Sequence, residues 1–191
     1  MAKPEIYVST DIEANGPIPG TYSMLALGSV ALDRTGKEIS RFYATIKPID
    51  TNGGHPETMA WWKTQPKAWE AVNKDTRFAE DVMKDYCNWL KGLPGKPVLV
   101  AYPVAFDSMF VLWYLFNFTG ENPFGFNTID IKTLAWTRLG GNLSQATKRR
   151  FPKRWFSKLP HNHVAVDDAA EQGQLFINIM ADDDDELWGP Q

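Results

Sequence analysis

The order of strand-like and helix-like segments restricts the fold of this chain more than any other feature of its sequence. Three segments with strand composition follow one another, at residues 5–13, 23–32 and 38–46. The turn sequence Asp-Arg-Thr-Gly at 33–36 separates the second from the third and favours a hairpin. Two further short apolar strands are predicted at 97–102 and 127–131, each of them close to helical patterns.

Helical patterns fill most of the chain after the third strand. We predict helices at residues 56–72, 76–93, 104–118, around 134–139 and at 167–180. Consecutive strands followed by strands that alternate with helices are typical of a mixed sheet covered by helices. The expected fold class is therefore α/β, with a central mixed five-stranded sheet flanked by helices.

The length of 191 residues suits one domain, and no repeat or linker divides the sequence. We expect a domain over residues 1–181, followed by an acidic tail at 182–191. No segment resembles a signal peptide, and the longest apolar stretch, 104–118, is too short to span a bilayer. These features predict a soluble, cytoplasmic protein with no membrane partner. The single cysteine excludes an internal disulfide and an all-cysteine metal site.

Two carboxylates lie near the end of the first predicted strand. Asp11 and Glu13 are two residues apart, so the strand directs both to the same face. Burying such a pair is costly unless a cation or hydrogen bonds compensate it. Ligands of open α/β sheets also bind at the ends of strands. The pair therefore favours metal binding, and a solvated strand end is the alternative.

Three further polar residues follow later elements. Asp107 begins the helix after the fourth predicted strand, where helix capping is the simpler interpretation of that residue alone. His163 lies in a polar loop, which suits a general base with a near-neutral pKa. Asp168 falls in the first turn of the last helix, where it can bind a metal or complement the helix dipole.

Together these positions resemble, in order and spacing, the signature motifs of a known family. The family is that of the DEDDh exonucleases, the DnaQ-like branch of the ribonuclease-H-like superfamily, which includes oligoribonuclease and ribonuclease T. The motifs that carry the resemblance are Asp11-Ile-Glu13, Phe106-Asp107, and His163 with Asp168. The tryptophan-containing segment at 59–63 indicates a branch near the mycobacterial-type exoribonucleases. The resemblance covers roughly residues 5–180 and implies a ribonuclease-H-like fold.

The resemblance implies a metal-dependent 3′–5′ exonuclease that releases nucleoside 5′-monophosphates. Oxygen ligands suit Mg²⁺ or Mn²⁺, and two ions about 3.5–4 Å apart stabilise the attacking and leaving oxygens. The implied ligands are Asp11, Glu13 and Asp168 for one ion, and Asp11 and Asp107 for the other. His163 would take the proton of the attacking water. His161 departs from the family spacing and His55 lies in a turn, so neither is the expected base.

Substrate contacts are predicted on both sides of the acidic residues. Backbone groups of Ala14 and Asn15 are expected to approach the terminal sugar. Phe106 or one residue of the pair Trp61 and Trp62, with Trp62 as the candidate, is expected to stack on a terminal base, an interaction worth about 1–3 kcal/mol. Neighbouring helical residues diverge by about 100°, so one tryptophan at most faces the cleft. A core position is the alternative for each.

A basic segment at residues 148–158 holds six lysines and arginines and no acidic residue. A solvated loop is one interpretation. Because the segment lies shortly before His163, we predict that it guides a single-stranded nucleic acid through Arg149, Arg150 and Arg154. RNA is preferred over DNA because of the family branches that the chain resembles.

Two other functions share these features. One is a non-catalytic nucleic-acid-binding module that keeps the fold, and the other is a divalent-metal phosphodiesterase for small nucleotides. Members of the family are often homodimers, so the resemblance also makes a homodimer an expected option.

Overall fold

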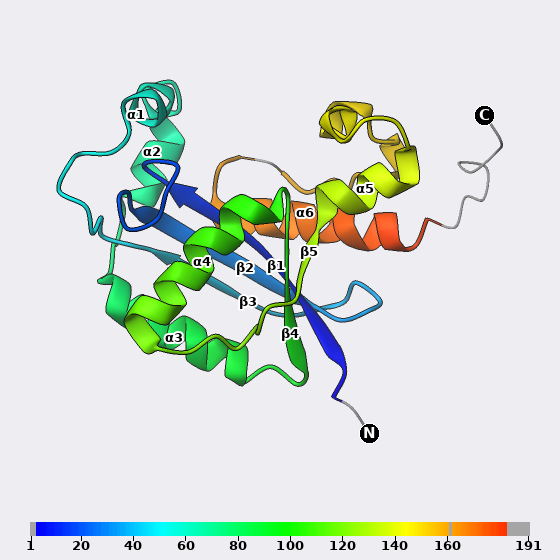
Figure 1. The fold of residues 1–191 in the computed structure, drawn as a ribbon, viewed down its shortest axis with the longest axis horizontal. Helices are drawn as coiled ribbons and strands as arrows, with labels where there is room; N and C mark the ends of the chain where they lie inside the picture. Colours follow the sequence, from blue (N-terminus) through cyan, green and yellow to red (C-terminus); the bar gives the residue numbers. More distant parts are fainter. Residues whose placement is uncertain (1–2, 161, 183–191) are drawn as a thin grey trace.

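The computed structural model describes residues 3–160 and 162–182, and a five-stranded sheet runs through its middle (Figure 1). The strands are β1 (Glu5–Ala14), β2 (Met24–Leu32), β3 (Glu38–Thr45), β4 (Lys96–Ala101) and β5 (Thr128–Asp130). They lie in the order β3-β2-β1-β4-β5, with β1 in the centre. β2 is antiparallel to both of its neighbours, whereas β1, β4 and β5 are parallel. The predicted mixed α/β sheet is confirmed. The prediction for His161 and those for the tail beyond Asp182 fall outside the described residues.

Helices occupy most of the remaining described chain. They are α1 (Pro56–Trp62), α2 (Pro66–Val72), α3 (Ala79–Lys91), α4 (Val104–Thr119), α5 (Ile131–Leu139) and α6 (Ala165–Met180), with short 3₁₀ turns η1 (Leu143–Gln145), η2 (Lys148–Arg150) and η3 (Lys153–Trp155). The single helix predicted at 56–72 is wrong, because it is broken before Pro66. A proline disfavours helical backbone in the residue before it, and Gln65 has φ −122° and ψ 57°. In the described part of the chain, no helix has both the length and the apolar character needed to cross a membrane.

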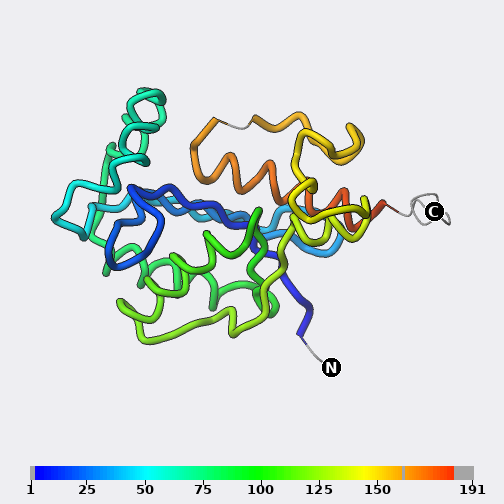
Figure 2. The backbone as a smooth tube through the Cα atoms, turned by 45° about the horizontal axis from the view of Figure 1, so that its top comes forward, coloured from blue at the N-terminus to red at the C-terminus, as the bar shows by residue number. Residues whose placement is uncertain are grey.

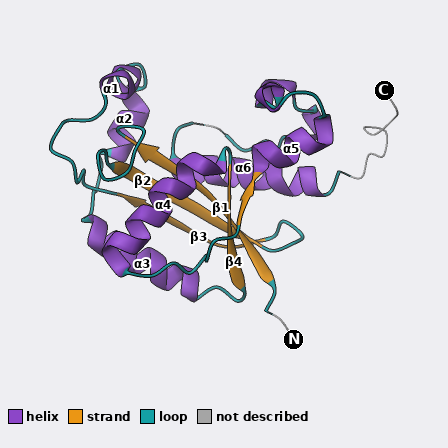
Figure 3. Cartoon of the chain, viewed as in Figure 1, coloured by secondary structure: helices purple, strands orange, loops and turns teal. Residues whose placement is uncertain are grey.

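The helices cover the two faces of the sheet unequally (Figures 2 and 3). α3 and α4 pack on one face, in a core that includes Val8 and Ile12 of β1. α6 lies across the other face, in a core that includes Tyr7. Because side chains alternate along a strand, Asp11 and Glu13 share the face of Tyr7 and lie on the side of α6.

The first turn of α6 lies directly on the sheet. Gly28 of β2 pairs with Asp11 of β1, and a Cβ atom at Gly28 would lie 2.2 Å from the carbonyl carbon of Ala165. Further along the helix, Gln172 Nε2 donates a 2.7 Å hydrogen bond to the carbonyl oxygen of Thr10. The absence of a side chain at Gly28 therefore brings the start of α6 against Asp11.

We expect Gly28→Ala to lower the free energy of unfolding by about 1–3 kcal/mol, the usual cost of overpacking. The added methyl group would meet backbone atoms of α6, which cannot change rotamer to make room. Urea unfolding measures the effect. Gly92→Ala is the matched control, because its new methyl would come no closer than 3.4 Å to a neighbouring atom. Equal stability of Gly28→Ala and the wild type would show that α6 does not need this close approach.

Candidate active site

Asp107 lies beside β1 although it is distant from that strand in the sequence. α4 follows β4, which is parallel to β1, so the first turn of α4 lies at the end of β1 where the acidic pair lies. Asp107 Oδ1 accepts a 3.0 Å hydrogen bond from the backbone N–H of Ile12, between Asp11 and Glu13. Asp107 is buried. The helix-capping interpretation is therefore insufficient, since this carboxylate also joins the acidic pair of β1.

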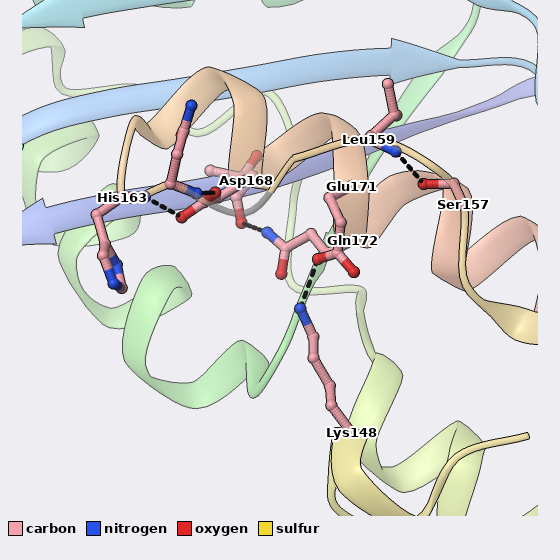
Figure 4. A network of polar contacts seen from close by, with 9 residues as sticks. Lys148, Ser157, Leu159, His163, Asp168, Glu171 and Gln172 are labelled. Atoms are coloured by element: carbon pink, nitrogen blue, oxygen red, sulfur yellow. Dashed lines mark hydrogen bonds and ion pairs between the residues drawn. The ribbon is translucent and has the colours of Figure 1, made fainter. Parts of the chain in front are cut away.

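Asp168 lies at the same site as Asp107, but it comes from α6, which covers the opposite face of the sheet from α4. It lies in the first turn of α6 and is buried. Its carboxylate accepts hydrogen bonds from the backbone N–H groups of Asn162, at 2.9 Å, and His163, at 3.1 Å (Figure 4). One ligand atom each from Glu13, His163 and Asp168 lie within 4.8 Å of one another. β1, α6 and the loop before α6 therefore converge on one site.

The pKa values show how strongly these carboxylates interact. Desolvation raises the pKa of Asp11 well above its ordinary value, and three neighbouring carboxylates, Asp107 foremost, raise it further. Burial, followed by the charges of Asp168 and Asp107, raises the pKa of Glu13 to about 8. Burial raises the pKa of Asp107 to about 7. Four carboxylates thus share one small region of low dielectric, and their charged forms are unfavourable there.

The donor set fits divalent cations. Carboxylate oxygens are the ligands that Mg²⁺ and Mn²⁺ prefer, and positive charge would relieve the repulsion among the four acids. The positive charge of Lys148 acts on Asp11 and lowers its pKa, but it is one charge beside four carboxylates. Asp11, Glu13, Asp107 and Asp168 are therefore the residues that would hold metal ions.

We expect the metal-free protein to lose thermal stability as the pH rises from about 5 to 8. The folded protein retains the proton of Glu13 up to a pKa of about 8, whereas the ordinary value is 4.5. Between these values the unfolded chain binds fewer protons than the folded protein, so stability falls with increasing pH. Differential scanning fluorimetry in chelator measures this decline.

Excess Mg²⁺ or Mn²⁺ should reduce the decline, because metal ions bind the deprotonated carboxylates of the folded state. A variant without the carboxylate, Glu13→Gln, should show a shallower decline in chelator. A wild-type profile that is flat in chelator, or equally steep with and without metal, would contradict the repulsion inferred above.

His163 lies beside the acidic residues in a loop, and its backbone is left-handed with φ 58°. Its ring meets the ring of Trp61 edge to face, with centroids 5.2 Å apart and planes at 89°. Trp61 is 39% exposed. The histidine is thus oriented by Trp61 on one side and by the Asp168 carboxylate, through the backbone, on the other. The position of His163 suits proton transfer at the site.

The structure places three of the predicted substrate-binding residues in contacts within the protein. Trp62 is 2% exposed, and its Nε1 donates a 3.0 Å hydrogen bond to the carbonyl oxygen of Ala14, so its ring offers no face to a base. The backbone N–H of Asn15 donates to Ser23, and its carbonyl accepts from His55. The carbonyl of Ala14 and both backbone groups of Asn15 are therefore engaged within the protein. Of the tryptophan pair, Trp61 is the exposed member.

Phe106 lies in the first turn of α4 with a partly exposed ring. It is 37% exposed, and its ring packs against Phe110 with centroids 5.2 Å apart. It remains a predicted stacking residue.

The basic segment divides into parts with different surroundings. Arg149 and Arg150 are exposed on η2. Arg154 pairs with Asp182, just beyond Met180 at the end of α6, and Met180 is about 18 Å along that helix from Asp168. Arg154 thus lies toward the far end of α6, and its role in guiding the strand stays a prediction. Lys148 points toward α6 instead, and no sequence signal distinguished it from its basic neighbours.

Comparisons with known proteins agree with this geometry. Residues 7–180 match the family model of the Rv2179c-like 3′–5′ exoribonuclease domain. The Escherichia coli protein Cap18, a 3′–5′ DNA exonuclease, is 29% identical over 180 residues, which cover 90% of each chain.

Two solved structures share the fold. The nuclease domain of 3′hExo, a DEDDh family member bound to rAMP, matches with a TM-score of 0.68 at 15% identity and covers 93% of this chain and 92% of that one. Pop2p of S. pombe, in a form with Mg²⁺ and Mn²⁺ bound, matches with a TM-score of 0.62 at 13% identity and covers 95% of this chain and 84% of that one. These likenesses confirm the predicted ribonuclease-H-like fold, and the family match includes all four carboxylates. The chain therefore belongs to the family of Rv2179c-like 3′–5′ exoribonuclease domains.

Proposed function

We propose that the chain removes nucleoside 5′-monophosphates from the 3′ end of single-stranded or short RNA, in a reaction that depends on divalent metal and on His163. Family membership makes it a 3′–5′ exonuclease, and the proposal concerns the polymer, the metal and the general base. One observation carries it: four carboxylates from β1, α4 and α6 meet beside a histidine. This arrangement is unfavourable without cations and suits attack of a water molecule on a phosphodiester.

Each residue of the site has a distinct role in this proposal. Asp11, Glu13, Asp107 and Asp168 would hold two ions, Mg²⁺ or Mn²⁺. When bound, such ions stabilise the attacking and leaving oxygens of an in-line displacement at phosphorus. His163 would accept the proton of the attacking water, and the Trp61 ring would keep the imidazole in place. None of these side chains changes its covalent state over a full turnover.

Substrate binding is assigned to groups that are exposed around the carboxylates. Phe106 would stack on a base near the 3′ end, and each such contact is worth about 1–3 kcal/mol. Arg149 and Arg150 would neutralise phosphates further along the strand. The family description supports RNA as the polymer, while the relationship to Cap18 favours DNA as the second candidate.

A degradation assay with matched RNA and DNA oligonucleotides tests the proposal. Each 5′-labelled single strand is incubated with Mg²⁺, with Mn²⁺ or with chelator, and the products are separated at single-nucleotide resolution. We expect stepwise shortening from the 3′ end, faster on RNA, that stops in chelator. Faster shortening of DNA would overturn the RNA assignment. Binding without metal-dependent shortening would favour the non-catalytic module, and cleavage restricted to dinucleotides would favour the small-nucleotide phosphodiesterase.

The homodimer and the cytoplasmic location remain predictions. Light scattering of the purified chain tests the first, and fractionation of the source cell tests the second.

A further inference from the structure

An ion pair from the basic segment lies along the helix that carries Asp168. Lys148 Nζ is 2.5 Å from Glu171 Oε2 (Figure 4). Glu171 follows Asp168 by one turn of α6, and its side chain is 7% exposed, whereas that of Lys148 is 29% exposed. The pair thus lies beside the carboxylates, with the lysine as its solvent-facing member.

Other contacts already hold this part of the chain in place. Tyr102 Oη donates a 3.1 Å hydrogen bond to the carbonyl oxygen of Ala146, two residues before Lys148. Ala146 and Phe151 are buried, and the Phe151 ring packs edge to face on Tyr102 with centroids 5.9 Å apart. These contacts fix the backbone on both sides of Lys148. The ion pair is therefore not required as a tether.

The chemistry of the lysine suits a phosphate. An ammonium group has three N–H donors, and Glu171 Oε2 accepts one of them. Lys148 is partly exposed, its ammonium lies 5.6 Å from the centroid of the Tyr102 ring, and its charge acts on Asp11, one of the four carboxylates. A strand that reaches those carboxylates brings its backbone phosphates within range of this ammonium. Glu171, by contrast, adds a negative charge beside the approaching strand.

We propose that Lys148 binds a backbone phosphate of the nucleic acid at the acidic site, and that Glu171 positions the ammonium while opposing the strand through its own charge. The proposal rests on the proposed function, because it assumes that the 3′ end of the nucleic acid lies at the carboxylates. It makes the two members of one ion pair act on substrate binding in opposite directions. A purely structural pair would give both substitutions the same sign.

The test is binding of a labelled single-stranded RNA to the full chain in Ca²⁺, followed by fluorescence anisotropy over a series of salt concentrations. The RNA is checked for integrity by gel after each titration. Lys148→Met should weaken binding on the order of tenfold, the usual scale for a hydrogen bond to a charged group. The slope of log affinity against log salt should fall by about 0.7, the value for one phosphate contact on a single strand. Glu171→Gln, which keeps an acceptor for the lysine and removes the charge, should tighten binding.

Matched controls come from the exposed pair Lys84 and Glu80 on α3, whose charged atoms are 2.7 Å apart. Lys84→Met and Glu80→Gln make the same changes of charge on the other side of the sheet and should leave the salt slope unchanged. Lys148→Arg should retain the slope that Lys148→Met loses. Thermal unfolding of each variant shows that it is folded.

Two results would overturn the proposal. One is an unchanged salt slope in folded Lys148→Met, and the other is equal weakening of binding by Lys148→Met and Glu171→Gln. Failure of the proposed function is seen separately, as wild-type protein that binds RNA but does not shorten it with Mg²⁺ or Mn²⁺. The binding comparison still decides the role of Lys148 in that case.

Discussion

Replacing Asp11 with asparagine is expected to abolish most exonuclease turnover and, at pH 8 in chelator, to raise the melting temperature. Desolvation and then the charges of the other three carboxylates raise the pKa of Asp11, so its ionised form is unfavourable in the metal-free protein. A neutral amide of the same shape removes that repulsion. It also removes a ligand, and lost stabilisation by the metal should lower turnover on the order of a thousandfold.

The two effects of Asp11→Asn are measured on the same preparation. Single-turnover degradation with Mn²⁺ gives the activity, and differential scanning fluorimetry in chelator gives the stability. Asp75→Asn is the control, because Asp75 is exposed and its left-handed backbone, φ 52°, suits asparagine equally. Retained activity in Asp11→Asn would show that Asp11 is not part of the active site. A lowered melting temperature would show that the four carboxylates are compensated within the protein.

Replacing His163 with alanine is expected to lower turnover by about 10²- to 10⁴-fold, the usual contribution of a general base. The variant should still bind metal, since all four carboxylates remain. The stabilisation of the protein by Mn²⁺ and the affinity for single-stranded RNA should therefore stay close to those of the wild type. The measurements are single-turnover rates, melting temperatures with and without Mn²⁺, and anisotropy.

His55→Ala provides the control for the loss of an imidazole. The His55 ring packs edge to face on Tyr22, with centroids 5.5 Å apart, and has no role in the proposed reaction. Wild-type turnover in His163→Ala would exclude the histidine from catalysis. A His163→Ala protein that loses its stabilisation by Mn²⁺ would make this side chain a metal ligand, because its ring lies among the ligand atoms of Glu13 and Asp168.

The acidic residues differ in how far the sequence alone could predict them. The shared face of Asp11 and Glu13 follows from the two-residue period of a strand, which is a local property. Asp107 and Asp168 became candidates only through their resemblance to family motifs, because each is also an ordinary residue for the first turn of a helix. Their convergence depends on the parallel pairing of β1 with β4 and on the close packing of the first turn of α6 against Gly28.

The surroundings of the predicted substrate-binding residues could be read from the sequence less well, because they depend on tertiary contacts. The sequence shows that Trp61 and Trp62 diverge, but which of them packs inward depends on the Ala14 carbonyl that Trp62 meets. The sequence also shows a basic segment, but the 3₁₀ turns within that segment point its basic side chains in different directions. Lys148 reaches Glu171 on α6, whereas Arg154 reaches Asp182 beyond the end of that helix.

The sequence by itself determined the class of the fold, the segments that form the sheet and the chemical type of the site, because these depend on periodicity and on residue types at local spacing. The tertiary structure alone decided which carboxylates meet, which aromatic rings remain exposed and which lysine faces the site. Those outcomes depend on contacts between residues such as Ile12 and Asp107, whose separation in the chain is too long for any local pattern to encode.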